Sequence, residues 1–211
     1  MERIFTPADI LLPADHPESW SVIACDQFTS EPEYWSRVQH RVSRPSALDM
    51  ILPEAWLAGT DPEQAGASIR CAMGEYLKSE SCRTVPESFI YVERTLPDGR
   101  LRRGLVGKLD LEAYDYHPGT RAPVQASEAT VPTRIGPRQQ LRRGAPMELP
   151  HVMILLNDPE KSVVEPITEQ KDGLELLYDF SLMEGGGAVR GYRVTGSAAE
   201  RVLASLDALE P

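Results

Sequence analysis

The sequence lacks the cysteine pattern that a disulfide framework or a thiolate metal site requires. Its three cysteines, Cys25, Cys71 and Cys82, are an odd number and include no Cys-X-X-Cys pair. We therefore expect reduced thiols in or near the core rather than disulfides or a zinc site. The four histidines show no metal-ligand spacing, so we predict no metal site. Nothing in the sequence identifies a cofactor.

Long apolar runs are absent too. Glu2 and Asp9 interrupt the early apolar residues, so no secretory signal peptide is recognisable. No stretch approaches the roughly 20 apolar residues that a membrane-spanning helix requires. With an apolar share of 41%, the chain can still form a sizeable core. We expect a cytoplasmic protein without a membrane partner.

Positive charge is in short supply. The chain has 22 Lys and Arg residues against 32 Asp and Glu residues, which gives a net charge of −10. A protein that coats nucleic acid needs a broad cationic surface, so this deficit argues against a nucleic-acid partner. It does not argue against a small anionic ligand held by a local group of arginines.

One stretch, residues 117–151, reverses this balance. It holds five arginines against two glutamates, a local charge of +3 that leaves −13 for the remaining residues, and it has six of the 18 prolines. We predict ordered, irregular backbone that presents arginines to an anion. The arginines are Arg121, Arg134, Arg138, Arg142 and Arg143.

Arg134, Arg138 and Arg142 recur at intervals of four residues. This spacing places them on one face of a strand, and on roughly one face of a helix. Gly136 and Pro137 favour the strand. Aligned guanidinium groups bind phosphate or carboxylate bidentately. The alternative interpretation is a solvated edge strand whose arginines pair with the protein's own carboxylates.

Two acidic residues are candidates for chemistry. Asp26 lies between a predicted buried strand and a helix start, where loops often carry function. It is a candidate general base or metal ligand, and the alternative is a capping and turn role. Glu128 is a candidate acid, base or arginine partner. We predict Asp26 and Glu128 as catalytic residues. The predicted ligand-binding residues are Gln27, Arg121, Arg134, Arg138 and Arg142.

Apolar periodicity and turn signals predict an α+β fold. Predicted helices, each opened by a capping box, cover about 30–42, 60–77 and 197–209. Predicted strands cover 21–25, 88–96, 100–111, 138–143, 151–159, 163–167, 175–182 and 188–194, and Pro97-Asp98-Gly99 forms a hairpin turn. The glycines at 185–187 indicate a turn or flap rather than a phosphate loop. This order predicts a mixed or antiparallel sheet with a β-hairpin and about three main helices packed on it.

Long motifs along most of the chain are similar to those of a known family. They are PADILLP (7–13), WSVIACDQFTSEPEYW (20–35), MILPE (50–54), YVERTL (91–96), RRGLVGKLDLEAYDY (102–116), PR (137–138), ELPHVMILLNDPEK (148–161), LYDFSLMEGGG (177–187) and RGYRV (190–194). Together they resemble the bacterial and archaeal family known as domain of unknown function 1015. The resemblance implies no established activity.

The resemblance does carry expectations about organisation and ligand. Members are about twice this length, and their second half has a Gly-Asp-Gly-Asn-His-Ser motif similar to that of sulfiredoxin- and ParB-like enzymes, a superfamily that includes free-serine kinases. Their genes often lie beside serine-biosynthesis genes. The resemblance thus implies that residues 1–211 form a single α+β domain equivalent to the N-terminal half of the family. It also implies a small phosphorylated or amino-acid metabolite as ligand, and a second chain with the C-terminal half as a further partner.

Several positions depart from the family pattern, although Arg134 and Arg138 are kept. The departures are Gln125, Ala129, Gly136, Asn157 and Ala188. The chain also ends after a helix that would lead into the second half. Two functions are therefore expected as alternatives. One is half of a kinase- or phosphotransfer-type enzyme linked to serine metabolism. The other is a non-catalytic, truncated or degenerate module for regulation or interaction.

Overall fold

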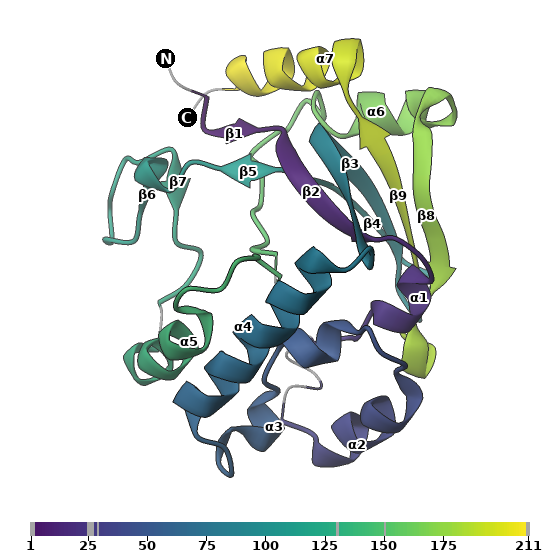
Figure 1. Cartoon of the computed structure of the whole chain (residues 1–211). Coiled ribbons are helices and arrows are strands. Elements are labelled where there is room, and N and C mark those ends of the chain that lie inside the picture. Colours follow the sequence, from purple (N-terminus) through teal and green to yellow (C-terminus); the bar gives the residue numbers. More distant parts are fainter. Residues whose placement is uncertain (1–2, 25–27, 29, 130, 150, 210–211) are drawn as a thin grey trace.

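The computed structural model describes residues 3–24, 28, 30–129, 131–149 and 151–209 (Figure 1). An antiparallel sheet with the strand order β2-β3-β9-β8 organises the fold, and β4 also pairs with β3. The long strand β3 pairs with β2 through its first half and with β4 and β9 through its second half. The bounds are β2 Ala8–Pro13, β3 Cys82–Thr95, β4 Leu101–Val106, β8 Glu175–Ser181 and β9 Ala188–Val194.

Two pairs of short strands lie outside this sheet. Antiparallel β1 Phe5–Thr6 and β5 Lys108–Leu109 form the first pair. Parallel β6 Tyr114–Asp115 and β7 Val124–Gln125 form the second. The second pair lies in the part of the chain that leads to the arginine-bearing stretch.

The helices lie in two groups. In Figure 1, α6 and α7 lie at the top beside the sheet, whereas α2, α3, α4 and α5 form a helical part at the bottom. Their bounds are α1 Pro17–Trp20, α2 Pro32–Arg41, α3 Glu54–Leu57, α4 Pro62–Lys78, α5 Ile135–Arg142, α6 Glu165–Gln170 and α7 Gly196–Asp207. Short 3-10 helices are η1 Ala47–Met50, η2 Leu111–Ala113, η3 Pro132–Arg134, η4 Lys171–Gly173 and η5 Met183–Gly185.

Three clusters of buried apolar side chains form the core. One joins the sheet, through Phe89 and Val194, to Val202 of α7. A second surrounds Ile69 and Met73 of α4. The third surrounds α2 and comprises Ile23, Tyr34, Trp35 and Val38. Each long helix therefore turns its apolar face toward one cluster, which fixes it relative to the sheet.

The predicted α+β class is confirmed. The helices expected at about 30–42, 60–77 and 197–209 correspond to α2, α4 and α7. The predicted hairpin is β3 and β4, and Gly99 in its turn has a φ of 83°, a conformation that glycine accepts without strain. The helices do not begin as the capping boxes predicted, because the N-cap residues are Glu31, Asp61 and Thr195.

Four predicted strands are wrong. Residues 21–24 and 151–158 have no strand structure, and 163–167 and 138–143 lie largely in or beside α6 and α5. Pro166 and Pro137 each lie in the first turn of a helix, where the missing N–H of proline leaves no helical hydrogen bond unmade. Val163, just before α6, and Ile167 within it are four residues apart, and both are buried in the first core cluster.

The cysteines fit the sequence prediction only in part. Cys71 and Cys82 are free, but Cys71 is exposed on α4 and Cys82 is half-buried. Burial raises the pKa of the Cys82 thiol. Cys25 lies outside the described residues.

Candidate functional site

The three arginines predicted to bind an anion lie along one helix rather than one strand. Arg134 ends η3, and Arg138 and Arg142 follow at successive turns of α5. Residues four apart on a helix are neighbours on one face, so the three guanidinium groups form a row. We call Arg134, Arg138 and Arg142 the arginine row. The spacing of four residues places the three arginines on a common face, as predicted, but on a helix. The predicted strand was wrong.

Close packing on α4 positions α5. A Cβ added to Gly66 of α4 would lie 3.0 Å from the Gln140 carbonyl oxygen and 3.4 Å from the Cα of Leu141, so glycine permits the close approach. The Leu141 side chain packs against the second core cluster. Arg70 of α4 donates a hydrogen bond of 3.1 Å to the Arg143 carbonyl oxygen just past the end of α5. These contacts hold α5 against α4, while the three side chains of the arginine row stay exposed.

The arginine row has two ion-pair partners among the described residues, and both are exposed to solvent. Arg134 lies 3.7 Å from the Glu54 carboxylate, and both side chains are at least 40% exposed. Arg142 forms an ion pair of 2.9 Å with Glu148, whose side chain is 76% exposed. Arg138 is exposed and has no ion pair or hydrogen bond with another described residue. Surface ion pairs of this kind contribute little, roughly 0 to 1 kcal/mol, so an anion can displace them.

The remaining predicted site residues do not join the row. Arg121 and Glu128 are both exposed, on the loops that flank β7. No hydrogen bond or ion pair connects either of them to the row within the part of the chain that the structure describes. Asp26 and Gln27 lie outside that part.

The sequence did not predict an Asp–His pair, Asp115 and His117, which lies at the end of β6. Asp115 accepts hydrogen bonds from the His117 backbone N–H at 2.9 Å and from Thr120 Oγ1 at 2.8 Å. Its Oδ1 also lies 2.6 Å from His117 Nδ1. The His117 backbone N–H is the largest cause that lowers the pKa of Asp115, to about 2. The Asp-X-His spacing at the end of a short strand is the sequence signal that could have predicted this pair. The pair closes a turn, which gives His117 a structural role.

Ion pairs hold the loop that contains the three glycines at 185–187. Glu184 has a φ of 54°, unusual for a residue other than glycine, and forms ion pairs of 2.9 Å with both Arg37 and Arg41 of α2. The hydrogen bond from Arg37 is the largest cause that lowers the pKa of Glu184. Arg94 donates a hydrogen bond of 2.9 Å to the Gly186 carbonyl oxygen. The loop therefore joins the sheet to α2 as a tight turn.

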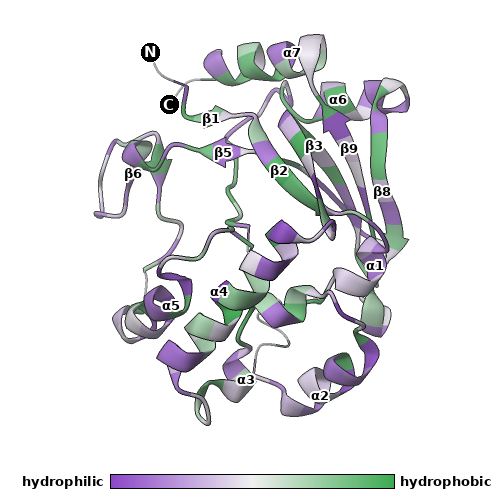
Figure 2. Ribbon diagram, viewed as in Figure 1, coloured by the Kyte–Doolittle hydropathy of each residue, from purple (hydrophilic) through white to green (hydrophobic). Residues whose placement is uncertain are grey.

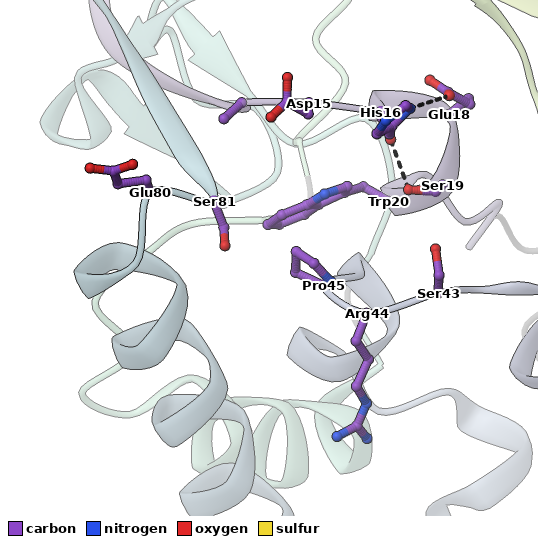
Figure 3. Close-up of a pocket in the computed structure, with 11 residues that line it drawn as sticks. Asp15, His16, Glu18, Ser19, Trp20, Ser43, Arg44, Pro45, Glu80 and Ser81 are labelled. Carbon is purple, nitrogen blue, oxygen red and sulfur yellow. Dashed lines mark hydrogen bonds and ion pairs between the residues drawn. The ribbon is translucent and has the colours of Figure 1, made fainter.

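A cleft of about 520 Å³ lies where three connections meet, β2 to α1, α2 to η1, and α4 to β3 (Figure 3). Trp20 forms part of its wall. The Arg44 side chain points away from Trp20 and pairs with Asp49 at 3.1 Å. The remaining charged groups are mainly acidic, and the lining residues are Ala14, Asp15, His16, Glu18, Ser19, Trp20, Ser43, Arg44, Pro45, Glu80 and Ser81. This acidic rim suits a neutral or cationic group better than an anion. No single motif could reveal it, because its residues come from three separate connections.

A buried ion pair lies in the middle of the sheet. Glu93 of β3 is 5% exposed and accepts hydrogen bonds from Lys171 Nζ at 2.8 and 3.0 Å and from Tyr91 at 3.0 Å. Burial alone would raise the pKa of Glu93, but the bonds from Lys171 and Tyr91 outweigh it and lower the pKa. Tyr91 also lies 2.8 Å from Thr168 Oγ1. The network satisfies its own groups and anchors η4 to the sheet.

The comparisons with known proteins give one match. The sequence model of a family described as "Protein of unknown function (DUF1015)" matches residues 7–210. The chain belongs to the DUF1015 family. No curated protein and no solved structure matches this DUF1015 chain.

The positions that we expect to depart from the family pattern lie mostly on the surface of this DUF1015 member. Gln125 is exposed and donates a hydrogen bond of 3.1 Å to the Ala122 carbonyl oxygen. Gly136 lies in the first turn of α5, and Ala188 begins β9 opposite Thr95. None of these three residues contacts the arginine row through a hydrogen bond within the described ranges.

Two further properties concern the described residues of this DUF1015 member. They include no cluster of three or more His, Cys, Asp and Glu side chains that could hold a metal ion. They also include no helix with the length and apolar character needed to cross a membrane.

Proposed function

We propose that the chain is a binding module for a small anionic metabolite, of the phosphorylated or amino-acid class, and that the arginine row is its anion-facing wall. The observation that supports the proposal is the row itself, with Arg134 at the end of η3, Arg138 and Arg142 at successive turns of α5, and no described partner for Arg138. Guanidinium groups match phosphate and carboxylate oxygens bidentately, which a row of lysines would not do.

The row forms one wall of a site rather than a pocket. Small-molecule sites are concave, whereas the arginines project from an exposed helix face. A second polypeptide surface, such as a chain equivalent to the second half of the family, would complete the enclosure. The proposal is limited to binding, because Glu128 contacts none of the three arginines and Asp26 lies outside the described residues.

Isothermal titration tests this proposal with O-phosphoserine, serine and inorganic phosphate as probes. The Arg138→Ala variant should bind the anionic probes about tenfold more weakly or worse, because a charge-assisted hydrogen bond contributes roughly 1.5–3 kcal/mol. Arg102→Ala is the matched control, since Arg102 is also exposed and has no described ion pair. Equal loss in both variants, or no binding of any probe by the native chain, would contradict the proposal.

A further inference from the structure

A run of five apolar residues lies on the surface between the arginine row and α6. Val152, Met153 and Leu155 are 82%, 79% and 82% exposed, and Ile154 and Leu156 are 44% and 46% exposed. The run belongs to the coil that passes β5 on its way to α6 (Figure 2). Scattered exposed apolar residues are common in proteins, but a contiguous run of this size indicates an interaction surface.

The backbone of this run is also unpaired. No backbone N–H or C=O group of residues 151–157 forms a hydrogen bond with another described residue. Val152, Ile154 and Leu156 would lie on one face of a strand, and Met153 and Leu155 on the other. A strand that is apolar on both faces is typical of burial on both sides within a sheet. The run therefore has the composition of a paired strand but lacks a paired neighbour.

The charges on the two sides of the run are opposite. Residues 131–149 carry four arginines and one glutamate, a balance of +3. Residues 158–165 carry three acidic residues and one lysine, a balance of −2. Antiparallel pairing of two identical runs sets the basic side of one copy opposite the acidic side of the other. Parallel pairing would oppose like charges, which costs free energy.

A groove beside the run offers a second copy both apolar side chains and four charged ones, Arg103, Asp158, Lys161 and Glu165. The groove has a volume of about 300 Å³, and Leu156 lines it together with Leu101 at the start of β4 and Val164. Leu101 is itself 41% exposed. An isologous dimer uses the same surface on both subunits, so each copy would contribute both a run and a groove.

We propose that two copies of the chain associate through residues 151–157, which pair as antiparallel strands about a two-fold axis. The pairing satisfies the backbone groups along one edge of each strand and brings the most exposed apolar side chains of both copies into cross-strand contact. The charge pattern on each side selects the antiparallel arrangement. This association does not depend on ligand binding by the arginine row.

Sedimentation velocity over a range of protein concentrations tests the proposal. The native chain should sediment as a dimer that dissociates on dilution. Leu155→Glu should weaken the dimer by roughly thirtyfold or more, because a charge would be buried at its centre. Leu155 is 82% exposed in the single chain, so this variant should unfold at the same urea concentration as the native monomer. Higher salt should also weaken the dimer, since the flanking charges are screened.

Leu111→Glu is the matched control, because Leu111 is 72% exposed on η2 and lies outside the run. It should dimerise like the native chain. A native chain that stays monomeric at the highest concentration, or that forms aggregates of undefined size, would overturn the proposal. Equal dissociation of the Leu155→Glu and Leu111→Glu variants would overturn it as well. Arg138→Ala should leave the dimer intact, and Leu155→Glu should leave the binding of phosphate probes unchanged, so this inference and the proposed function fail separately.

Discussion

The sheet and the segment 131–157 differ in how far their charged and apolar groups are already satisfied within the chain. On β3, Glu93 is 5% exposed and is held by two hydrogen bonds from Lys171. On α5, Arg138 is exposed without a described partner. The apolar side chains differ in the same way, since Phe89 is 0% exposed and Leu155 is 82% exposed.

This difference separates the residues that stabilise the fold from those available to a partner. A buried charge costs free energy unless its partner is held in place, so the Glu93 network is committed to the sheet. An exposed arginine or an unpaired apolar run stabilises the isolated chain little, so its effect should appear only on binding. Substitutions in the sheet should therefore change stability, and substitutions of Arg138 or of the apolar run 152–156 should change association.

The largest effect should come from breaking the buried ion pair. Lys171→Met removes two hydrogen bonds from the buried Glu93 carboxylate and leaves it only the Tyr91 hydroxyl and Arg103, which is 4.0 Å away, so the free energy of unfolding should fall by about 3 kcal/mol. Urea denaturation followed by circular dichroism measures this change. Lys108→Met is the control, because Lys108 is exposed on β5 and its loss should change the free energy by less than about 0.5 kcal/mol. Similar losses in the two variants would contradict a special role for the Glu93 network.

A smaller but still large effect should follow from Gly187→Ala at the start of the β9 hairpin. Gly187 has a φ of 86°, and an added Cβ would overlap the Thr95 carbonyl oxygen, which belongs to β3 and cannot move aside. The combined cost of the left-handed backbone and the overlap should be about 2 kcal/mol. Urea denaturation checks the value. A variant as stable as the native chain would contradict this prediction, because it would show that β3 can shift near Thr95 to make room for the added Cβ.

The pH dependence of stability should show how much the ionised Glu93 carboxylate contributes to the free energy of unfolding. Its pKa is lowered in the folded protein, so its contribution is present above the unfolded pKa and is lost as the pH falls through the folded pKa. Glu93→Gln should therefore be least stable relative to the native chain near neutral pH. The gap should narrow in acid, over the range below the unfolded value of about 4.3. Thermal unfolding at a series of pH values tests this, and a gap that does not change with pH would contradict it.

The smallest effect should come from the exposed helix. An added Cβ at Gly136 of α5 meets no heavy atom within 4 Å. Gly136→Ala should stabilise the chain by about 0.5 kcal/mol or less, through the helix preference of alanine. Urea denaturation together with titration of phosphate probes checks both stability and binding. A clear loss of stability would mean that α5 is packed more tightly than its exposure shows.

Local signals predicted the elements that local chemistry decides. The regular apolar spacing of residues 60–77 was enough to place α4. Pro97-Asp98-Gly99 was enough to place the hairpin. The same kind of signal failed at Gly136-Pro137, because a glycine–proline pair that interrupts a helix interior is tolerated in the first turn. Apolar composition likewise predicted a strand at 151–159, where no described neighbour pairs with it.

The sequence alone determined the α+β class, the family and the common face of the arginine row, because residue type, spacing and long motifs carry these properties directly. Only the tertiary structure decided that Glu93 is paired with Lys171, 78 residues away, and that three connections form one cleft. It also decided that the run 152–156 stays on the surface. These properties depend on which distant segments meet, and neither composition nor periodicity records the partners that burial brings together.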